Sequence, residues 1–260
     1  MILQALNDYY LRKAADPQTS LAPEGFELKA IPFVLVLDAQ GRLLHLADRR
    51  EGSGKKKEAR GELVPQGVKK TSGVAANLLW DSAEYVLGVD TRGKPERVAE
   101  QHAAFVQRFA QSFGVQPEDA GLRAVAAFLA NALPAAREAL ALHPAWPEIM
   151  ETNPLLTFQL ASDTVLLCQR AAVLAALRAM DAGPGAPADG ICLVSGEPDS
   201  IARLHPAIKG VWGAQTSGAN IVSFNLDAFS SYGKAQSFNA PVGSRAAFAY
   251  TTALNHLLSK

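Results

Sequence analysis

Strand-like and helical segments occupy separate parts of this chain instead of alternating along it. Apolar, β-branched runs that are typical of strands lie near the beginning, at 31–38 and 63–65, and near the end, at 191–194 and 221–224. Between residues 95 and 180 most apolar residues recur at helical spacing, apart from a strand-like run at 155–160. Because a doubly wound sheet needs strands and helices in alternation, this order predicts an α+β fold. We expect mixed, mainly antiparallel small sheets, a helical middle and a C-terminal helix.

Local patterns predict several individual elements. Apolar spacing predicts helices over 2–14 and 95–113, the second ending at Gly114. Two apolar runs at 31–38 and 43–46, joined by a turn at 39–41, predict a hairpin. We also expect a short buried strand at 85–89, separate helices around Leu122 and from Ala135, and a final helix capped by Ser244.

Length and composition bound the class of protein. The 260 residues suit a single domain, 1–260, with a sub-boundary near 183–188 where glycine and proline accumulate. No run of about 18 apolar residues is present, and the N-terminus lacks the features of a signal peptide. Two cysteines, Cys168 and Cys192, are too few for a disulfide framework or a four-cysteine zinc site. We therefore expect a soluble, cytoplasmic protein without a membrane partner or cofactor.

The charges are balanced overall but unevenly placed. The chain has 25 basic and 25 acidic residues, yet 42–70 holds nine basic against four acidic residues. Between 81 and 163 the balance inverts to eleven acidic against six basic, and 203–245 is basic again, with four cations against Asp227. A polyanion responds to local charge because salt screens distant charges. The two basic segments are therefore the candidates for binding one.

The stretch 203–220 is the most informative of these segments. Its glycines would let the backbone approach a phosphate or a base edge, and its amide and hydroxyl side chains could bond there. The candidate ligand-binding residues are Lys209, Gly210, Gly213, Gln215, Ser217 and Asn220. Gly213 and Gly218 have the spacing of a nucleotide-binding P-loop, but Ala219-Asn220 replaces the required Lys-Ser/Thr pair. A loop whose glycines serve only turns is the alternative.

A second candidate segment, 66–73, combines lysines with small polar residues. Its candidate contacts to phosphates or groove edges are Lys69, Lys70, Thr71 and Ser72, with Asn77 close behind. Lys55, Lys56 and Lys57 form a less specific electrostatic contact, since a lysine run beside glycines is usually a solvated surface. We expect the 66–73 and 203–220 segments to fold side by side into one cationic cleft.

Patterns that indicate an enzyme are sparse. Ser195-Gly196-Glu197 lacks the preceding glycine of a nucleophile elbow, and the histidines are scattered. Asp38, Asp48 and Asp90 lie at predicted strand ends, where metal-dependent nucleases place carboxylates, so a nuclease remains an alternative. Both cysteines are expected to be buried apolar residues.

Several segments together resemble a known family. Residues 1–10 (MILQALNDYY), 63–69 (LVPQGVK) with 79–81 (LWD), 202–210 (ARLHPAIKG), 223–225 (SFN) and 246–255 (AAFAYTTALN) resemble the type I-C CRISPR-associated large subunit. Members of that family are longer and end in a helical bundle. The resemblance therefore implies that this chain is an N-terminal domain, truncated from a longer protein.

The family resemblance implies a non-catalytic role in the Cascade surveillance complex. There the N-terminal domain of the large subunit recognises the protospacer-adjacent motif and aids R-loop initiation, while the crRNA reads the target by base pairing. Its implied partners are double-stranded target DNA, the crRNA-bound Cascade subunits and a helicase–nuclease that is recruited later. An assembly module whose loops face protein subunits or crRNA stays open as an alternative.

Overall fold

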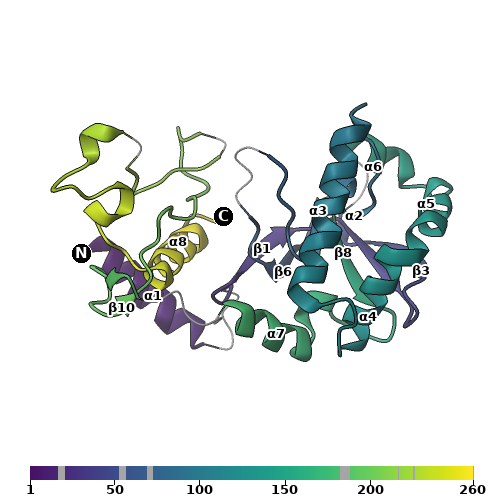
Figure 1. The fold of residues 1–260 in the computed structure, drawn as a ribbon, viewed down its shortest axis with the longest axis horizontal. Coiled ribbons are helices and arrows are strands. Elements are labelled where there is room, and N and C mark those ends of the chain that lie inside the picture. The colour runs from purple at the N-terminus through teal and green to yellow at the C-terminus, as the bar shows by residue number, and fades with distance from the viewer. Residues whose placement is uncertain are drawn as a thin grey trace. The chain divides into compact units, whose positions relative to one another are not determined.

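The computed structural model describes residues 1–16, 21–52, 57–68, 73–181, 188–215, 217–224 and 226–259, with Arg178 and Asp181 described by their backbone only. The chain divides into two compact units (Figure 1). Unit 1 combines both chain ends, Met1–Glu24 and Ala182–Lys260, and unit 2 is the continuous segment Gly25–Asp181.

Unit 2 is built around a four-stranded sheet with the order β3-β2-β8-β7. β2 (Phe33–Leu37) pairs in parallel with β8 (Leu155–Leu160), while β3 (Leu43–Asp48) and β7 (Trp80–Ser82) pair antiparallel on the two edges. All five residues of β2 are buried, as expected of a central strand covered on both faces. The predicted hairpin is confirmed: Asp38 accepts hydrogen bonds from the Gln40 and Arg42 amides and so closes its turn.

Helices from the middle of the chain cover this sheet. They are α2 (Ala83–Val86), α3 (Pro95–Phe113), α4 (Ala120–Ala127), the π-helical turn η2 (Phe128–Ala132), α5 (Leu133–Ala141), α6 (Trp146–Thr152), the 3-10 turn η3 (Leu167–Gln169) and α7 (Ala171–Asp181). Phe105 of α3 and Phe128 of η2 both pack on Phe158 of β8, with ring centroids 6.3 and 5.7 Å apart. α3 begins with Pro95 in its first turn and ends at Gly114, whose φ is +75°.

Two small antiparallel sheets complete unit 2. β1 (Phe26–Ala30) pairs with β6 (Gly61–Pro65), and β4 (Arg50–Glu51) pairs with β5 (Glu58–Ala59). β6 leads directly into the 66–73 candidate segment, so the β1–β6 pair positions the start of that segment.

Unit 1 is held together by its two longest helices, which come from opposite ends of the chain. α1 (Ile2–Ala14) and α8 (Ser244–Leu258) pack side by side (Figure 1), and Tyr10 meets Phe248 edge-on with centroids 5.6 Å apart. Its other elements are β9 (Gly190–Ile191) with β10 (Pro198–Asp199), and the 3-10 turns η4 (Asp227–Phe229) and η5 (Gln236–Asn239). Among the described residues of 188–243, the other segments are turns with isolated bridges between Ile201 and Gly243, Ile208 and Ala219, and Ser231 and Lys234.

The structure confirms the α+β fold class and corrects several local predictions. The segment predicted as a strand at 85–89 contains the end of α2 and the turn that follows it. Residues 221–224 form no strand, and the strand predicted at 191–194 shrinks to Gly190–Ile191. The helices predicted around Leu122 and Ala135 form one continuous run through η2. Ser244 is the first helical residue of α8 and not its cap; its Oγ donates to the Ser200 carbonyl instead.

Two further predictions concern membrane-spanning helices and the sub-boundary at 183–188. In the described part of the chain, no single helix is long and apolar enough to cross a membrane; Ala120–Ala141 and Trp146–Thr152 satisfy that criterion only together, across a bend of 107°. Most of the sub-boundary predicted at 183–188 lies outside the described residues.

Candidate nucleic-acid interface

The 208–219 loop of unit 1 is closed at its base. Ile208 and Ala219 form an antiparallel bridge, in which each amide donates to the other residue's carbonyl at 2.9 and 2.8 Å. Inside the loop, the Gly218 amide donates to the Gln215 carbonyl at 2.8 Å. These backbone bonds limit the conformations of the loop without using its side chains.

Helix α8 anchors the base of this loop. Asn255 accepts a hydrogen bond from the Lys209 amide at 2.7 Å through Oδ1 and donates to the Ala207 carbonyl at 3.2 Å through Nδ2. Just upstream, buried His205 lies 2.6 Å from the hydroxyl of Tyr250 through Nδ1. Asn255 was missed in the sequence because an asparagine on a helix has no local signature of a distant loop.

The turns of the loop require glycine. Gly210, Gly213 and Gly218 have φ values of +72°, +78° and +103°, which side chains rarely adopt. A Cβ on Gly218 would lie 2.8 Å from the Ile208 carbonyl oxygen, so this glycine also allows the two arms of the loop to meet closely. Gly213 has open space around it, so its φ alone demands glycine there.

The predicted ligand-binding side chains of this loop all face solvent. Lys209, Gln215, Ser217 and Asn220 are exposed, although Lys209 Nζ donates to the Ser217 carbonyl at 2.7 Å. Trp212, which the sequence analysis did not select, is 100% exposed. This indole is available to contact a partner.

The second candidate segment is described only at its two ends. Lys69, Lys70, Thr71 and Ser72 lie outside the described residues. Before them, the Gly67 amide donates to Glu27 Oε1 at 2.9 Å, and the Val68 amide donates to Asn77 Oδ1 at 3.0 Å.

Asn77 has a structural role in place of the DNA contact expected of it. Its side chain is only 5% exposed, and its oxygen is engaged by the backbone of Val68. The backbone amide of Asn77 donates a hydrogen bond to Asp81 Oδ2 at 2.8 Å. Asn77 therefore holds the start of the segment and has no open surface to present to a groove.

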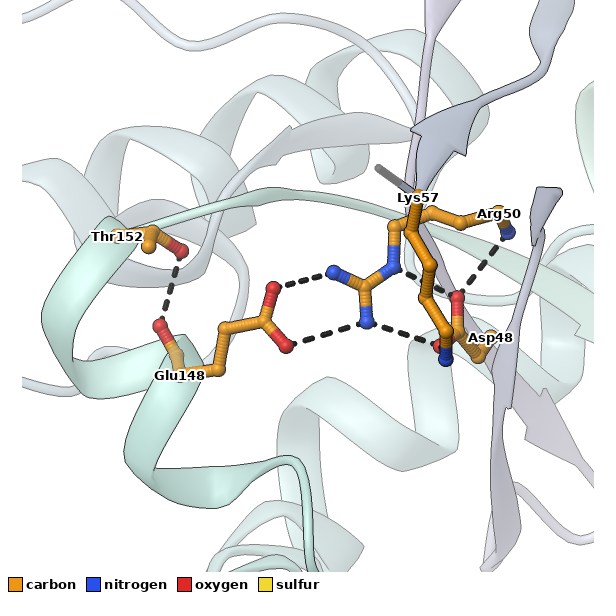
Figure 2. Close-up of polar contacts among 5 residues, drawn as sticks. All are labelled: Asp48, Arg50, Lys57, Glu148 and Thr152. Carbon is orange, nitrogen blue, oxygen red and sulfur yellow. Dashed lines mark hydrogen bonds and ion pairs between the residues drawn. The ribbon is translucent and has the colours of Figure 1, made fainter. Parts of the chain in front are cut away.

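Only one residue of the secondary lysine cluster lies among the described residues. Lys55 and Lys56 lie outside the described residues, and Lys57 Nζ lies 3.1 Å from Asp48 Oδ2. Arg50 contacts the same aspartate, because its Nε donates a hydrogen bond to Asp48 at 2.8 Å. The two terminal nitrogens of Arg50 donate hydrogen bonds to the carboxylate of Glu148 at the start of α6 (Figure 2). The hydrogen bond from Arg50 holds the pKa of Asp48 far below its ordinary value. Lys57 thus belongs to a surface ion-pair network, and its contact with phosphate stays a prediction.

The three carboxylates of the nuclease alternative do not converge. Asp38 and Asp48 lie at opposite ends of the β2–β3 hairpin, because Phe33 pairs with Asp48 while Leu37 pairs with Leu43. Asp90 instead caps the 92–94 turn, accepting from the amides of Arg92 and Lys94. Across the described ranges, no group of three His, Cys, Asp or Glu side chains is arranged to hold a metal ion. This geometry removes the specific basis of the nuclease hypothesis.

A comparison with protein-family models gives a match to CRISPR-associated protein (Cas_Csd1) over residues 6–260. The chain belongs to this family. The resemblance noted in the sequence is thereby confirmed, and the chain is a CRISPR-associated protein of a type I system that takes part in antiviral defence. A search of curated proteins finds no match.

The Cas_Csd1 match spans both compact units. The 208–219 loop belongs to unit 1, and the 66–73 segment belongs to unit 2. The single cationic cleft expected from the sequence stays a prediction.

Proposed function

We propose that this chain is a non-catalytic DNA-recognition subunit of a type I-C Cascade complex in the cytoplasm. It would recognise the protospacer-adjacent motif as duplex and aid R-loop initiation beside it. The crRNA-bound subunits would then extend base pairing, and a helicase–nuclease would be recruited to cut the target. The family membership supports the setting, and the 208–219 loop supports the DNA contact.

The observation that carries this proposal is the combination of a bridged backbone and exposed polar side chains in the 208–219 loop and at the adjoining Asn220. Its two arms are bridged at Ile208 and Ala219. Glycines at 210, 213 and 218 would let its backbone approach the minor groove of DNA, which is only about 6 Å wide. Gln215 and Asn220 carry amides that can donate to and accept from base edges. A loop held in place before binding loses little conformational entropy when it enters a groove.

Unit 1 also carries exposed cations that could contact phosphates. Lys234 and Lys209 are exposed in the same unit, and Arg203 and Arg245 add two more exposed cations. Arg245 is partly neutralised by Asp199 at 3.3 Å, whereas no salt bridge with Arg203 occurs among the described residues. Contacts from such cations to phosphates position a protein on DNA, and base-edge contacts give specificity. Lys69 and Lys70 would add phosphate contacts from unit 2.

Binding of target duplexes by the assembled complex tests the proposal. Gln215→Ala and Asn220→Ala should reduce the affinity ratio between duplexes with and without the motif by about tenfold, because each removes base-edge hydrogen bonds. Ser230→Ala, which changes another exposed polar residue of unit 1, should leave the ratio unchanged. Fluorescence anisotropy with labelled duplexes measures both affinities.

Two results would count against the proposal. If neither amide variant alters the affinity ratio, the loop does not read bases. If Lys209 crosslinks to protein subunits of the complex and never to DNA, the loop is an assembly surface instead. A nuclease is tested separately by cleavage of plasmid with Mg²⁺ or Mn²⁺ and the variant Asp90→Ala.

A further inference from the structure

A short segment of unit 1, residues 226–239, adds very little to the core of that unit. In Figure 1 it is the yellow-green loop that precedes α8. All of its residues are exposed except Ser237, which is buried, and Asn239, which is half-buried. The segment nevertheless carries four large apolar side chains that are 45–98% exposed: Leu226, Phe229, Tyr232 and Phe238. Large apolar side chains that gather on one segment without a role in the core indicate a surface for a partner.

Hydrogen bonds give the tip of this segment a fixed shape. Ser231 and Lys234 form an antiparallel bridge, and the Lys234 amide donates to the Ser231 carbonyl at 2.9 Å. The side chain of Asn239 holds both arms of this turn. Its Oδ1 accepts from the Ser231 amide at 2.8 Å, and its Nδ2 donates to the Lys234 carbonyl at 2.9 Å. Tyr232, which lies between the two arms, is therefore presented on a turn that is formed before any partner binds.

The backbone at Tyr232 shows that a tyrosine is a poor choice for the turn itself. Tyr232 and Gly233 have φ values of +51° and +70°, the left-handed values that a two-residue hairpin turn favours at both central positions. Asparagine followed by glycine suits such a turn best, and a bulky residue with positive φ is strained.

The tyrosine side chain does not offset this strain within the fold. It is 98% exposed, and among the described residues its hydroxyl has no hydrogen-bond partner. Strained residues of this kind are concentrated at functional sites. The role of Tyr232 is therefore to be found outside unit 1.

Charge and residue type favour a protein over a nucleic acid as the partner. The segment contains one cation, Lys234, and one anion, Asp227, so it has no net charge. A surface for nucleic acid needs an excess of cations, because contacts with phosphates supply much of the affinity. Aromatic side chains with few charges are instead typical of the core of a protein–protein interface.

We propose that residues 226–239 form an interface through which this chain binds another protein subunit of its complex, with Tyr232 as the anchor. The partner would present an apolar pocket with a hydrogen-bonding group at its end, because a buried tyrosine hydroxyl needs a partner. Phe229 and Phe238 would add apolar area to the contact. The interface rests on the membership in the complex proposed above, and it goes beyond the DNA contact because it assigns a different surface.

Substitution of Tyr232 separates the interface from the fold. Tyr232→Asn should lower the affinity of the full 260-residue chain for the crRNA-bound subunits about thirtyfold, because it removes the anchor. The same variant should have an unchanged or higher melting temperature, because asparagine suits the left-handed turn better than tyrosine. Tyr232→Phe keeps the ring and should lose only about fivefold. Biolayer interferometry measures the affinities, and circular dichroism measures the melting temperatures.

A matched control removes an exposed apolar side chain elsewhere. Leu142→Asn changes a residue that is 89% exposed at the end of α5 in unit 2, and it should leave the affinity unchanged. Equal effects of Tyr232→Asn and Leu142→Asn on the affinity would overturn the proposal.

Photo-crosslinking identifies what Tyr232 contacts. The amino acid p-benzoylphenylalanine at position 232 should crosslink to a protein subunit in the assembled complex. Crosslinks only to crRNA or target DNA would assign the segment to a nucleic acid and refute the interface. Self-association of the chain alone that Tyr232→Asn abolishes would assign it to a second copy, with the same consequence.

The outcome is separate from that of the DNA proposal. Gln215→Ala acts on motif discrimination within the assembled complex, whereas Tyr232→Asn acts on entry into the complex and should leave discrimination unchanged when the chain is saturating. If the wild-type chain binds the crRNA-bound subunits and Tyr232→Asn binds them equally well, only the interface is wrong. If the wild-type chain does not bind them, the membership in the complex is wrong and the interface with it.

Discussion

Among individual residues, His205 and Tyr250 connect the candidate loop to the core of unit 1. Both are buried, His205 Nδ1 lies 2.6 Å from the Tyr250 hydroxyl, and His205 Nε2 has no hydrogen-bond partner in the part of the chain that the structure describes. Burial lowers the pKa of His205 below its ordinary value of 6.5 and raises the pKa of Tyr250 to about 12. The neutral form of both side chains is therefore the one that fits the fold.

The lowered pKa of His205 predicts a loss of stability in acid. Below pH 6.5 the unfolded chain binds a proton that the folded chain resists, so the free energy of unfolding falls as pH decreases. The slope for one such group approaches at most about 1.4 kcal/mol per pH unit. His102, whose pKa burial also lowers, adds to the slope of the wild type.

Urea unfolding at pH 7.5, 6.5 and 5.5 measures this effect. His205→Gln cannot titrate, so its stability should vary less with pH than that of the wild type. Ser230→Ala, a change at an exposed residue of unit 1 without a titratable group, serves as the control and should keep the wild-type slope. An unchanged slope in His205→Gln would show that this histidine does not resist protonation.

At the level of elements, unit 2 depends on a close contact between a turn and a helix. Gly41, in the β2–β3 turn, has φ +81°, and an added Cβ would lie 2.4 Å from the Ala124 carbonyl oxygen and 2.7 Å from the Phe128 amide nitrogen. The turn meets the helical run where α4 passes into η2. Its backbone therefore approaches another backbone with no room for a side chain.

Gly41→Ala should destabilise unit 2 by about 2–4 kcal/mol. Steric overlap with backbone atoms and the positive φ both oppose a side chain at this position. Gly61→Ala is the matched control, because a Cβ there has nothing within 4 Å and its φ is not positive. Chemical denaturation followed by circular dichroism gives both values, and similar losses in the two variants would contradict this account of the turn.

At the scale of the whole molecule, the two units differ in how the chain builds them. Unit 2 is continuous from Gly25 to Asp181 and contains its own sheet and aromatic core. Unit 1 needs both ends of the chain, since Leu6 and Tyr10 of α1 pack in the same core as Phe248 and Tyr250 of α8. The core of unit 1 can therefore form only when α8 is present.

A fragment of residues 25–181 should consequently fold alone and unfold in one cooperative transition in urea. Residues 182–260 without α1 should not, because they lose the apolar surface that Leu6 and Tyr10 cover. Circular dichroism and urea titration of both fragments check this. Non-cooperative unfolding of 25–181 would mean that the division into units does not reflect independent stability.

Helices and strands that follow from periodic apolar spacing were predicted correctly. The roles of residues that depend on contacts with distant parts of the chain were not. The helix over 95–113 and the 31–46 hairpin follow from apolar spacing and glycine positions, which are local. Residues 85–89 have strand-like composition, but Ala83–Val86 forms a helical turn whose residues are all buried. Asn77 and Lys57 were selected by residue type, and only their neighbours, Val68 and Asp48, reveal that they support the fold.

The family, the fold class and the glycine-rich loop could be recognised in the sequence, because each depends on residue order and local backbone preference. The anchoring of that loop by Asn255 and the buried His205–Tyr250 pair could not. Asn255 is 46 residues away from Lys209 in the sequence, and Tyr250 is 45 residues away from His205. Folding brings these residues to hydrogen-bond distance, and such pairing depends on distances that only the three-dimensional structure sets.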